Sequence, residues 1–173
     1  MAALSNNHAS ITACEISKIR AERLKYNLAK QGAGSVYVMV ADATKLDDFF
    51  AFDKILLDAP CSGSGTITEN TDFENTFTQT LIQKSVRLQT LLLTKALKLL
   101  KPGHEMVYST CSILKEENEE VVEKVLKSKQ AEIVPITLDT EGITLLRTNL
   151  PGTLCVCPSK LYEGFFIAKI RKL

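Results

Sequence analysis

Two cysteines in short polar turns are the side chains of this sequence best suited to covalent chemistry. Cys61 lies in residues 58–65 (DAPCSGSG), where a proline stiffens the turn and small residues let a ligand approach closely. Cys111 lies in residues 108–112 (YSTCS), a second turn of small polar residues. A single cysteine in such a turn usually only fills space, but each of these follows an apolar run typical of a buried strand. We therefore expect the two thiols to lie near each other in one cleft.

Three acidic residues follow predicted strands at their carboxyl ends: Glu15, Asp42 and Asp58. Each could simply cap the helix or turn that comes next. Ligands of open α/β sheets, however, bind just beyond the carboxyl ends of the strands, so three acids there favour a ligand site. In a nucleotide-binding fold, the acid at the end of the fold's second strand accepts hydrogen bonds from ribose hydroxyls. This role suits Glu15, which ends the first strand predicted in this sequence. Asp42 would then meet an adenine amino group.

The elements that must position these residues alternate between strand and helix. Apolar runs predict strands at residues 11–14, 36–40, 54–57, 106–108, 133–138, 153–157 and 165–170. Periodic apolar spacing predicts helices at residues 16–31, 76–101 and 116–129. The last two strands, joined around residues 158–160, are expected to form a hairpin. We predict one α/β domain over residues 1–173, doubly wound around a mostly parallel sheet.

Composition and charge exclude several classes of protein. The chain has 173 residues, 45% hydrophobic and 24% charged, as in ordinary globular domains, so a disordered tail or a fibre does not fit. The 21 Lys and Arg residues against 20 Asp and Glu residues argue against a basic module that binds nucleic acid by bulk charge. No apolar run approaches the roughly 20 residues of a membrane span, and the start lacks the pattern of a signal peptide. We expect a cytoplasmic protein with reduced thiols.

Other polar residues are expected to be structural. Cys155 and Cys157 share one face of a β-like run, but they lack a second pair of metal ligands because the two histidines fit no zinc spacing. We expect them in the core and predict no metal site. The acidic run at residues 116–120 is expected to form the exposed start of a helix, favoured by the helix dipole. Within it, Asn118 is expected to order the Cys111 loop.

The two cysteine turns and the end of the chain resemble one protein family. Residues 58–65 and 108–113, followed by EENE at residues 116–119, look like two signature motifs of the Sun/Fmu family of RNA (cytosine-5-)-methyltransferases. Residues 163–169 (EGFFIAK) are similar to the family's C-terminal strand. The resemblance implies a Rossmann-like methyltransferase fold, S-adenosyl-L-methionine as the methyl donor, and RNA, with ribosomal RNA expected, as the substrate.

The resemblance also implies a role for each candidate residue. Glu15 and Asp42 fall at the family's second and third cofactor motifs, and with Asp58 they are expected to bind S-adenosylmethionine. Cys111 is implied as the nucleophile, which adds to carbon 6 of cytosine and makes carbon 5 reactive. Cys61 is implied to assist product release, and Asp58 to stabilise the adduct at nitrogen 3. Cytosine-5 DNA methyltransferases instead use the thiol that corresponds to Cys61, so the assignment depends on the second thiol.

The sequence departs from the family at two places. The first motif, a strand running into a Gly-Gly-Lys-type loop, is absent, since ten residues precede Ile11 and none is Gly or Lys. We therefore expect a chain without its leading strand, whose sheet has two unpaired central edges and exposed apolar surface. A missing N-terminal segment or a partner chain would complete that sheet. The loop at residues 66–73 also lacks the Arg-rich, Trp-containing stretch of many members.

Two other functions stay open at this point. A chain without the first motif could be a non-catalytic remnant that binds RNA or a partner chain. Binding of S-adenosylmethionine would distinguish an active methyltransferase from such a remnant. A methyltransferase for a small molecule or a protein would leave the second cysteine motif without a purpose. The leading hypothesis is an RNA cytosine-5 methyltransferase that works through a covalent cysteine–cytosine adduct.

Overall fold

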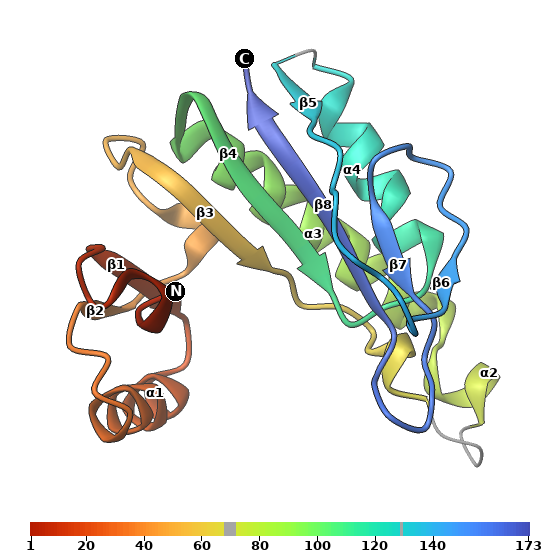
Figure 1. The fold of residues 1–173 in the computed structure, drawn as a ribbon, viewed down its shortest axis with the longest axis horizontal. Coiled ribbons are helices and arrows are strands. Elements are labelled where there is room, and N and C mark those ends of the chain that lie inside the picture. Colours follow the sequence, from red (N-terminus) through yellow and green to blue (C-terminus); the bar gives the residue numbers. More distant parts are fainter. Residues whose placement is uncertain (68–71, 129) are drawn as a thin grey trace. The chain divides into compact units, whose positions relative to one another are not determined.

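The computed structural model of the protein describes residues 1–67, 72–128 and 130–173 (Figure 1). The chain forms two compact units, Met1–Asp47 and Asp48–Leu173, which are described separately. The single domain expected over residues 1–173 stays a prediction. Part of the loop whose sequence departs from the family, residues 68–71, lies outside the described residues. Within the described ranges, no helix is long and apolar enough to cross a membrane.

The first unit is a parallel strand–helix–strand unit (Figure 1). Its elements are η1 (Ala3–Ser5), β1 (Ile11–Glu15), α1 (Lys18–Lys30), β2 (Val36–Val40) and η2 (Ala43–Lys45). β1 and β2 pair in parallel, with Glu15 opposite Val40. α1 begins two residues later than predicted because the Ser17 side chain caps it, accepting a hydrogen bond from the Arg20 amide. The two predicted strands and the helix between them are thus confirmed.

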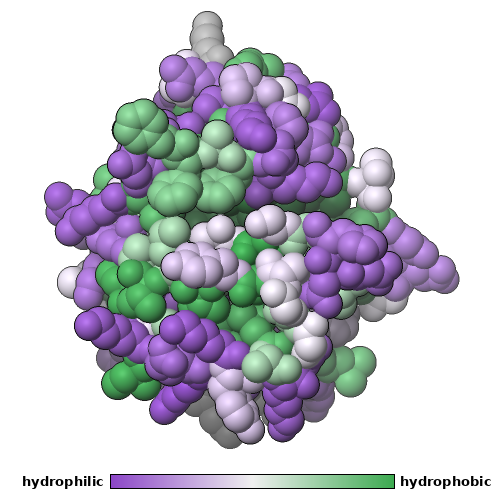
Figure 2. Space-filling model, turned by 90° about the vertical axis from the view of Figure 1, so that its left-hand side faces the viewer, coloured by the Kyte–Doolittle hydropathy of each residue, from purple (hydrophilic) through white to green (hydrophobic). Residues whose placement is uncertain are grey.

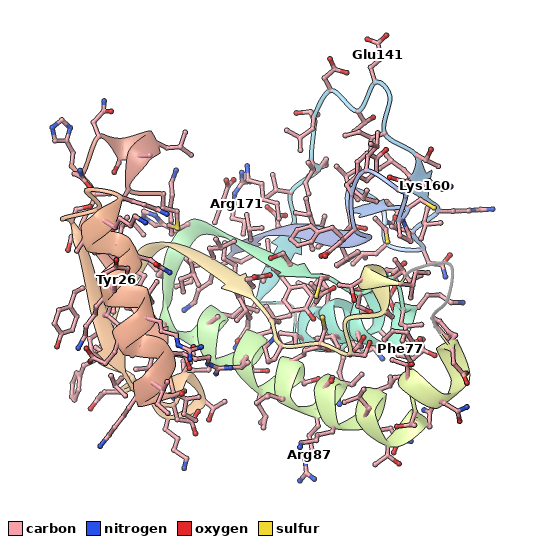
Figure 3. The ribbon with its side chains drawn as sticks, turned by 90° about the horizontal axis from the view of Figure 1, so that it is seen from below. Tyr26, Phe77, Arg87, Glu141, Lys160 and Arg171 are labelled. Carbon is pink, nitrogen blue, oxygen red and sulfur yellow. The ribbon has the colours of Figure 1, made fainter. Side chains whose placement is uncertain are left out.

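This unit has little buried core. Within residues 1–47, all of which the structure describes, Ala21 is the one buried side chain. Several large apolar side chains are exposed, namely Ile16, Ile19, Tyr26 and Tyr37. Tyr26 lies on α1 in Figure 3, and Figure 2 shows apolar surface, in green, between hydrophilic residues, in purple. The exposed apolar surface expected from the sequence is therefore present.

The second unit contains a mixed six-stranded sheet with α3 and α4 on one face (Figure 1). Its elements are β3 (Phe52–Asp58), η3 (Ser64–Thr66), α2 (Phe73–Thr76), α3 (Gln79–Leu99), β4 (Leu100–Thr110), η4 (Lys115–Glu117), α4 (Glu119–Leu126), β5 (Ala131–Ile133), β6 (Leu145–Leu146), β7 (Leu154–Val156) and β8 (Phe165–Lys172). The strand order is β3-β4-β8-β7-β6, with β5 also paired to β8. β3 and β4 are parallel, whereas β8 is antiparallel to β4, β5 and β7. The α/β class and the antiparallel C-terminal hairpin are confirmed.

The core of the second unit lies between the sheet and the inner faces of α3 and α4. Leu93 of α3 and Val121 of α4 are buried in one cluster with Tyr108 of β4 and Phe166 of β8. The rings of Tyr108 and Phe166 meet edge to face, with centroids 6.3 Å apart. On the opposite side of α3, Arg87 points away from the sheet (Figure 3). This packing fixes the ends of β3 and β4, after which the candidate site residues follow.

Two predicted helices are wrong in extent. The helix predicted at residues 76–101 is shorter, because Thr78 caps α3 and Leu100 is already extended as the first residue of β4. The helix predicted at residues 116–129 is interrupted at Asn118, whose φ of −109° and ψ of −98° separate η4 from α4. Both changes follow from contacts outside the helix that periodicity does not reveal.

The predicted strand at residues 133–138 is also wrong. β5 ends at Ile133, and although the Val134 amide still donates to the sheet, Pro135 has no amide hydrogen to continue the pairing. The two-residue strand β6 was too short for any periodic signal. Among the described residues, β1 pairs only with β2, and β3 only with β4.

Candidate active site

The two candidate thiols meet where β3 and β4 end. Asp58, the last residue of β3, is in register with Ser109 of β4, so the loops that follow begin side by side. Cys61 and Cys111 lie in these loops, and their Sγ atoms are 3.3 Å apart. Both side chains are half-buried. The structure thus brings together the two thiols that the sequence places in separate turns.

The Cys61 thiol is held in its protonated form. Burial raises the pKa of Cys61 to about 12, and the hydrogen bond with Cys111 and the charge of Glu117 add to the rise. At neutral pH the S–H group of Cys61 is therefore able to donate to the neighbouring sulfur.

Asn118 frames the Cys111 loop from the junction of η4 and α4. The side chain of Asn118 is fully buried, and its Oδ1 accepts a hydrogen bond from the Thr110 hydroxyl at 2.6 Å. Its Nδ2 donates to the carbonyl oxygen of Ser112 at 2.9 Å. The residues on both sides of Cys111 are therefore held by one amide, which orders this loop as the sequence predicts.

Further hydrogen bonds join the two cysteine loops directly. The hydroxyl oxygens of Ser64 and Ser112 are 2.8 Å apart, and the Gly65 amide donates to the carbonyl oxygen of Cys111 at 2.9 Å. The Gly164 amide, just before β8, donates to the carbonyl oxygen of Gly65 at 2.8 Å. Three segments that are distant in the sequence thus form one hydrogen-bonded frame around the thiols.

Glu117 is the main site residue that the sequence reasoning missed. The acidic run at residues 116–120 was expected to be exposed, but Glu117 is 0% exposed and Glu119 is 5% exposed. Both oxygens of the Glu117 carboxylate accept hydrogen bonds from Ser62, from its amide at 2.7 Å and from its hydroxyl at 2.6 Å. The expectation is wrong because η4 packs against the Cys61 loop and removes Glu117 from water, and no spacing within the acidic run reveals this contact.

Asp58 lies exposed at the end of β3, on a turn held from two sides. Its Oδ1 accepts a hydrogen bond from the Ser109 hydroxyl at 2.9 Å, which orients the carboxylate. The Ala59 amide donates to the Ser109 carbonyl oxygen at 2.8 Å, and Gln89 of α3 donates to the carbonyl oxygen of Pro60 at 3.0 Å. The helix and the neighbouring strand therefore both fix the turn that leads to the first thiol. Nothing in the sequence pattern singles out Gln89.

The two other acidic residues lie together in the first unit. Parallel pairing places Glu15 opposite Val40, and the Ala41 amide donates to the carbonyl oxygen of Glu15 at 3.2 Å. Asp42 follows directly, at the same carboxyl edge of the two strands. The predicted pair of acids is therefore brought together at one edge of this small sheet.

Both carboxylates of this pair are ionised and held by their own turns. Oε1 of Glu15 accepts from the Ser17 amide and the Arg20 guanidinium, both at 2.7 Å, and the Arg20 bond is the main cause that lowers the pKa of Glu15. Oδ1 of Asp42 accepts from the hydroxyl and the amide of Thr44, which lower the pKa of Asp42. The second oxygen of Asp42 lies 3.7 Å from the Lys45 ammonium group. Carboxylate oxygens can accept further hydrogen bonds from the hydroxyl or amino groups of a ligand.

The five predicted site residues thus fall into two clusters, one in each unit. Glu15 and Asp42 follow β1 and β2, whereas Asp58, Cys61 and Cys111 follow β3 and β4. Both Cys155 and Cys157 were expected in the core; Cys155 is buried in the core of the second unit, whereas Cys157 is only half-buried, so the prediction is wrong for Cys157. In the part of the chain that is described, no group of three or more His, Cys, Asp or Glu side chains is arranged to hold a metal ion.

Known proteins resemble this chain over its whole length. Residues 1–171 match the family described as 16S rRNA methyltransferase RsmB/F. Ribosomal RNA small subunit methyltransferase F of Shewanella piezotolerans is 36% identical over 180 residues, which cover 100% of this chain and 37% of that protein. This chain therefore spans about 37% of the length of that curated relative.

Two solved structures are similar to this chain in both fold and sequence. NSun6 from Pyrococcus horikoshii, solved with the S-adenosylmethionine analogue SFG, has a TM-score of 0.85 at 31% identity, covering 99% of this chain and 43% of its own. A methyltransferase homologue from the same organism has a TM-score of 0.83 at 35% identity, covering 99% of this chain and 56% of its own. The Rossmann-like methyltransferase fold expected from the resemblance is confirmed.

Proposed function

Because the chain belongs to the RsmB/F family of 16S rRNA methyltransferases, which use S-adenosylmethionine, we propose that it methylates carbon 5 of a cytosine in ribosomal RNA. The observation that carries this proposal is the 3.3 Å separation between the Sγ atoms of Cys61 and Cys111. Carbon 5 of cytosine is a weak nucleophile until a thiolate has added to carbon 6. The two thiols lie after the ends of two neighbouring strands, where one can serve as that nucleophile and the other as its hydrogen-bond partner.

Cys111 is the proposed nucleophile. Its thiolate adds to carbon 6 of the cytosine, which forms an Sγ–C6 bond and moves the electron pair of the C5–C6 double bond to carbon 5. S-adenosylmethionine, when bound, supplies the methyl group that carbon 5 takes up. Loss of the carbon 5 proton then restores the double bond and expels Cys111 as a thiolate.

Cys61 is proposed to assist release of the product, and Asp58 is proposed to assist formation of the adduct. Cys61 lies against the sulfur that must leave carbon 6, and its S–H group can donate a hydrogen bond to that sulfur as the Sγ–C6 bond breaks. A water molecule takes up the carbon 5 proton in this step, so Cys61 aids release of the product. Asp58 directs its Oδ1 to Ser109 and has Oδ2 as an acceptor for protonated nitrogen 3 of the adduct. The base must leave its stack to reach these groups, so a loop or a flipped nucleotide is the expected form of the RNA.

The cofactor is proposed to bind through its adenosine part to the first unit. Glu15 would accept hydrogen bonds from the ribose hydroxyls, and Asp42 would accept one from the adenine amino group. We further propose a cytoplasmic location, because the proposed substrate is ribosomal RNA and the curated relatives are bacterial proteins.

The unpaired strand edges support the proposal that a further segment or a partner chain completes the sheet. In the described residues, β1 and β3 each pair on one side only, and large apolar side chains of the first unit are exposed. A strand from outside residues 1–173, in the same protein or in a partner chain, would cover such edges. Slower amide hydrogen exchange in β1 and β3 when such a segment is added would support this proposal, and unchanged exchange would contradict it.

Covalent trapping tests the proposed reaction. An unmethylated 16S rRNA transcript and radiolabelled S-adenosylmethionine are incubated with each variant, and adducts are resolved on a denaturing gel. Cys61→Ala should accumulate a protein–RNA adduct, whereas Cys111→Ala should form none and transfer no methyl group. Cys157→Ala, which removes a thiol outside the site, serves as the control.

Two outcomes would overturn parts of the proposal. The reverse pattern of adducts would make Cys61 the nucleophile. Absence of adduct and of methyl transfer in every variant, with no calorimetric binding of S-adenosylmethionine, would leave a non-catalytic protein that binds RNA or a partner.

A further inference from the structure

Glu117 is a buried carboxylate that is hydrogen-bonded to Ser62 through both of its oxygens. Its side chain is 0% exposed, and both oxygens accept hydrogen bonds from Ser62, the residue directly after Cys61. Tyr108, buried in β4, donates its hydroxyl to the main-chain carbonyl oxygen of Glu117 at 2.7 Å. In the described ranges of the chain, no ion pair includes Glu117. Burying such a charge is unfavourable unless its hydrogen bonds are well formed, so the two bonds to Ser62 must be held closely.

The position of Glu117 in the chain couples the two cysteine loops. Glu117 binds the Cys61 loop through Ser62, and its neighbour Asn118 binds the residues on both sides of Cys111. Because Glu117 and Asn118 are adjacent, a shift of one cysteine loop is resisted by contacts to the other. This pair of buried side chains therefore helps to hold the two sulfurs 3.3 Å apart, together with the direct hydrogen bonds between the loops.

We propose that Glu117 is a positioning residue, which acts through Ser62 to hold the Cys61 thiol against Cys111. It is needed for release of the covalent cysteine–cytosine adduct rather than for its formation. The inference rests on the proposed function, in which Cys111 forms the adduct and Cys61 assists its release. The Asn118 contacts hold Cys111 independently of the Glu117 carboxylate, so adduct formation does not depend on that carboxylate.

Single-turnover kinetics separate the two steps. Glu117→Gln keeps the shape of the side chain but removes the charge and one acceptor, so Ser62 loses one of its two bonds. We expect adduct formation at the wild-type rate and release slowed roughly 10- to 100-fold, the scale of a misplaced catalytic group. Ser62→Ala, which removes only the hydroxyl bond, should slow release roughly 3- to 10-fold. Release in the double variant should be no slower than in Glu117→Gln alone, because both changes disrupt the same Glu117–Ser62 pair.

The matched control is Glu116→Gln, an exposed acid in the same run, which should leave both rates unchanged. Equal slowing of formation and release in Glu117→Gln would show a merely structural role and overturn the inference. If Glu117→Gln does not fold, Ser62→Ala decides, and wild-type release in that variant would also overturn it. If Cys61→Ala traps the adduct but neither of these variants slows release, the inference fails and the proposed function stands. If Cys61→Ala traps no adduct, the proposed function itself fails.

Discussion

Gly65 and Gly164 are in direct backbone contact, with the Gly164 amide donating to the Gly65 carbonyl oxygen at 2.8 Å. A Cβ atom at Gly65 would lie 2.2 Å from the carbonyl oxygen of Gly164 and 2.9 Å from that of Cys111. These neighbours are backbone atoms, which cannot turn aside as a flexible side chain does. The frame around the two thiols therefore depends on a glycine at this position.

Gly65→Ala should destabilise the fold and disturb the site at once. Overpacking of this kind costs roughly 1–3 kcal/mol in the free energy of unfolding, which urea titration followed by circular dichroism measures. Gly34→Ala is the control, because a Cβ at Gly34 meets nothing within 4 Å. A Gly65→Ala variant as stable as Gly34→Ala would contradict the observed contact.

Asn118→Ala should loosen the Cys111 loop. The change removes the partner of the buried Thr110 hydroxyl and of the Ser112 carbonyl oxygen, at a cost of roughly 1–3 kcal/mol in the free energy of unfolding. Adduct formation with the RNA transcript should slow as well, since Cys111 is no longer held. Asn149→Ala, at an exposed side chain, should change neither quantity. Adduct formation at the wild-type rate in Asn118→Ala would refute this role.

Alkylation of Cys61 should report its raised pKa. Iodoacetamide reacts with thiolates, and burial raises the pKa of Cys61 to about 12, so labelling in the folded protein should keep rising toward that pH. In urea, labelling should instead level off above the ordinary pKa of 9.0. Peptide mapping by mass spectrometry measures the rate at this cysteine, and a midpoint near 9.0 in the folded protein would contradict the prediction.

The same shift predicts how stability depends on pH. Because the pKa of Cys61 is higher in the folded than in the unfolded chain, its contribution is fully present below pH 9.0 and is lost as the pH rises toward 12. The free energy of unfolding should therefore fall over this range, and less steeply in Cys61→Ala. Burial also raises the pKa of Cys155 to about 11, so some of the fall should remain in that variant.

Glu15→Gln should weaken binding of S-adenosylmethionine. A hydrogen bond to a charged group contributes roughly 1.5–3 kcal/mol, so the dissociation constant measured by calorimetry should rise by about 10-fold or more. Glu22→Gln, at an exposed position of α1, provides the control. Equal affinities of the two variants would remove Glu15 from the proposed cofactor site.

Local patterns in the sequence predict the order of strands and helices and the turns that carry the candidate residues. Apolar runs and helical periodicity are local properties, which is why β1, β2 and β3 were predicted to within two residues. The placement of Asp58, Cys61 and Cys111 after strand ends follows from the same local pattern. Recognition of the two cysteine motifs then indicated the family.

Which of these residues come into contact depends on the packing of distant segments. The 3.3 Å between the sulfurs of Cys61 and Cys111, the burial of Glu117 against Ser62 and the contact of Gly65 with Gly164 each join segments that are about 50 or more residues apart in sequence. Burial and pKa depend on which atoms surround a group in space, and an acidic run alone does not reveal them. Glu117 looked like a solvated charge because packing of η4 against the Cys61 loop, rather than its neighbours in sequence, removes it from water.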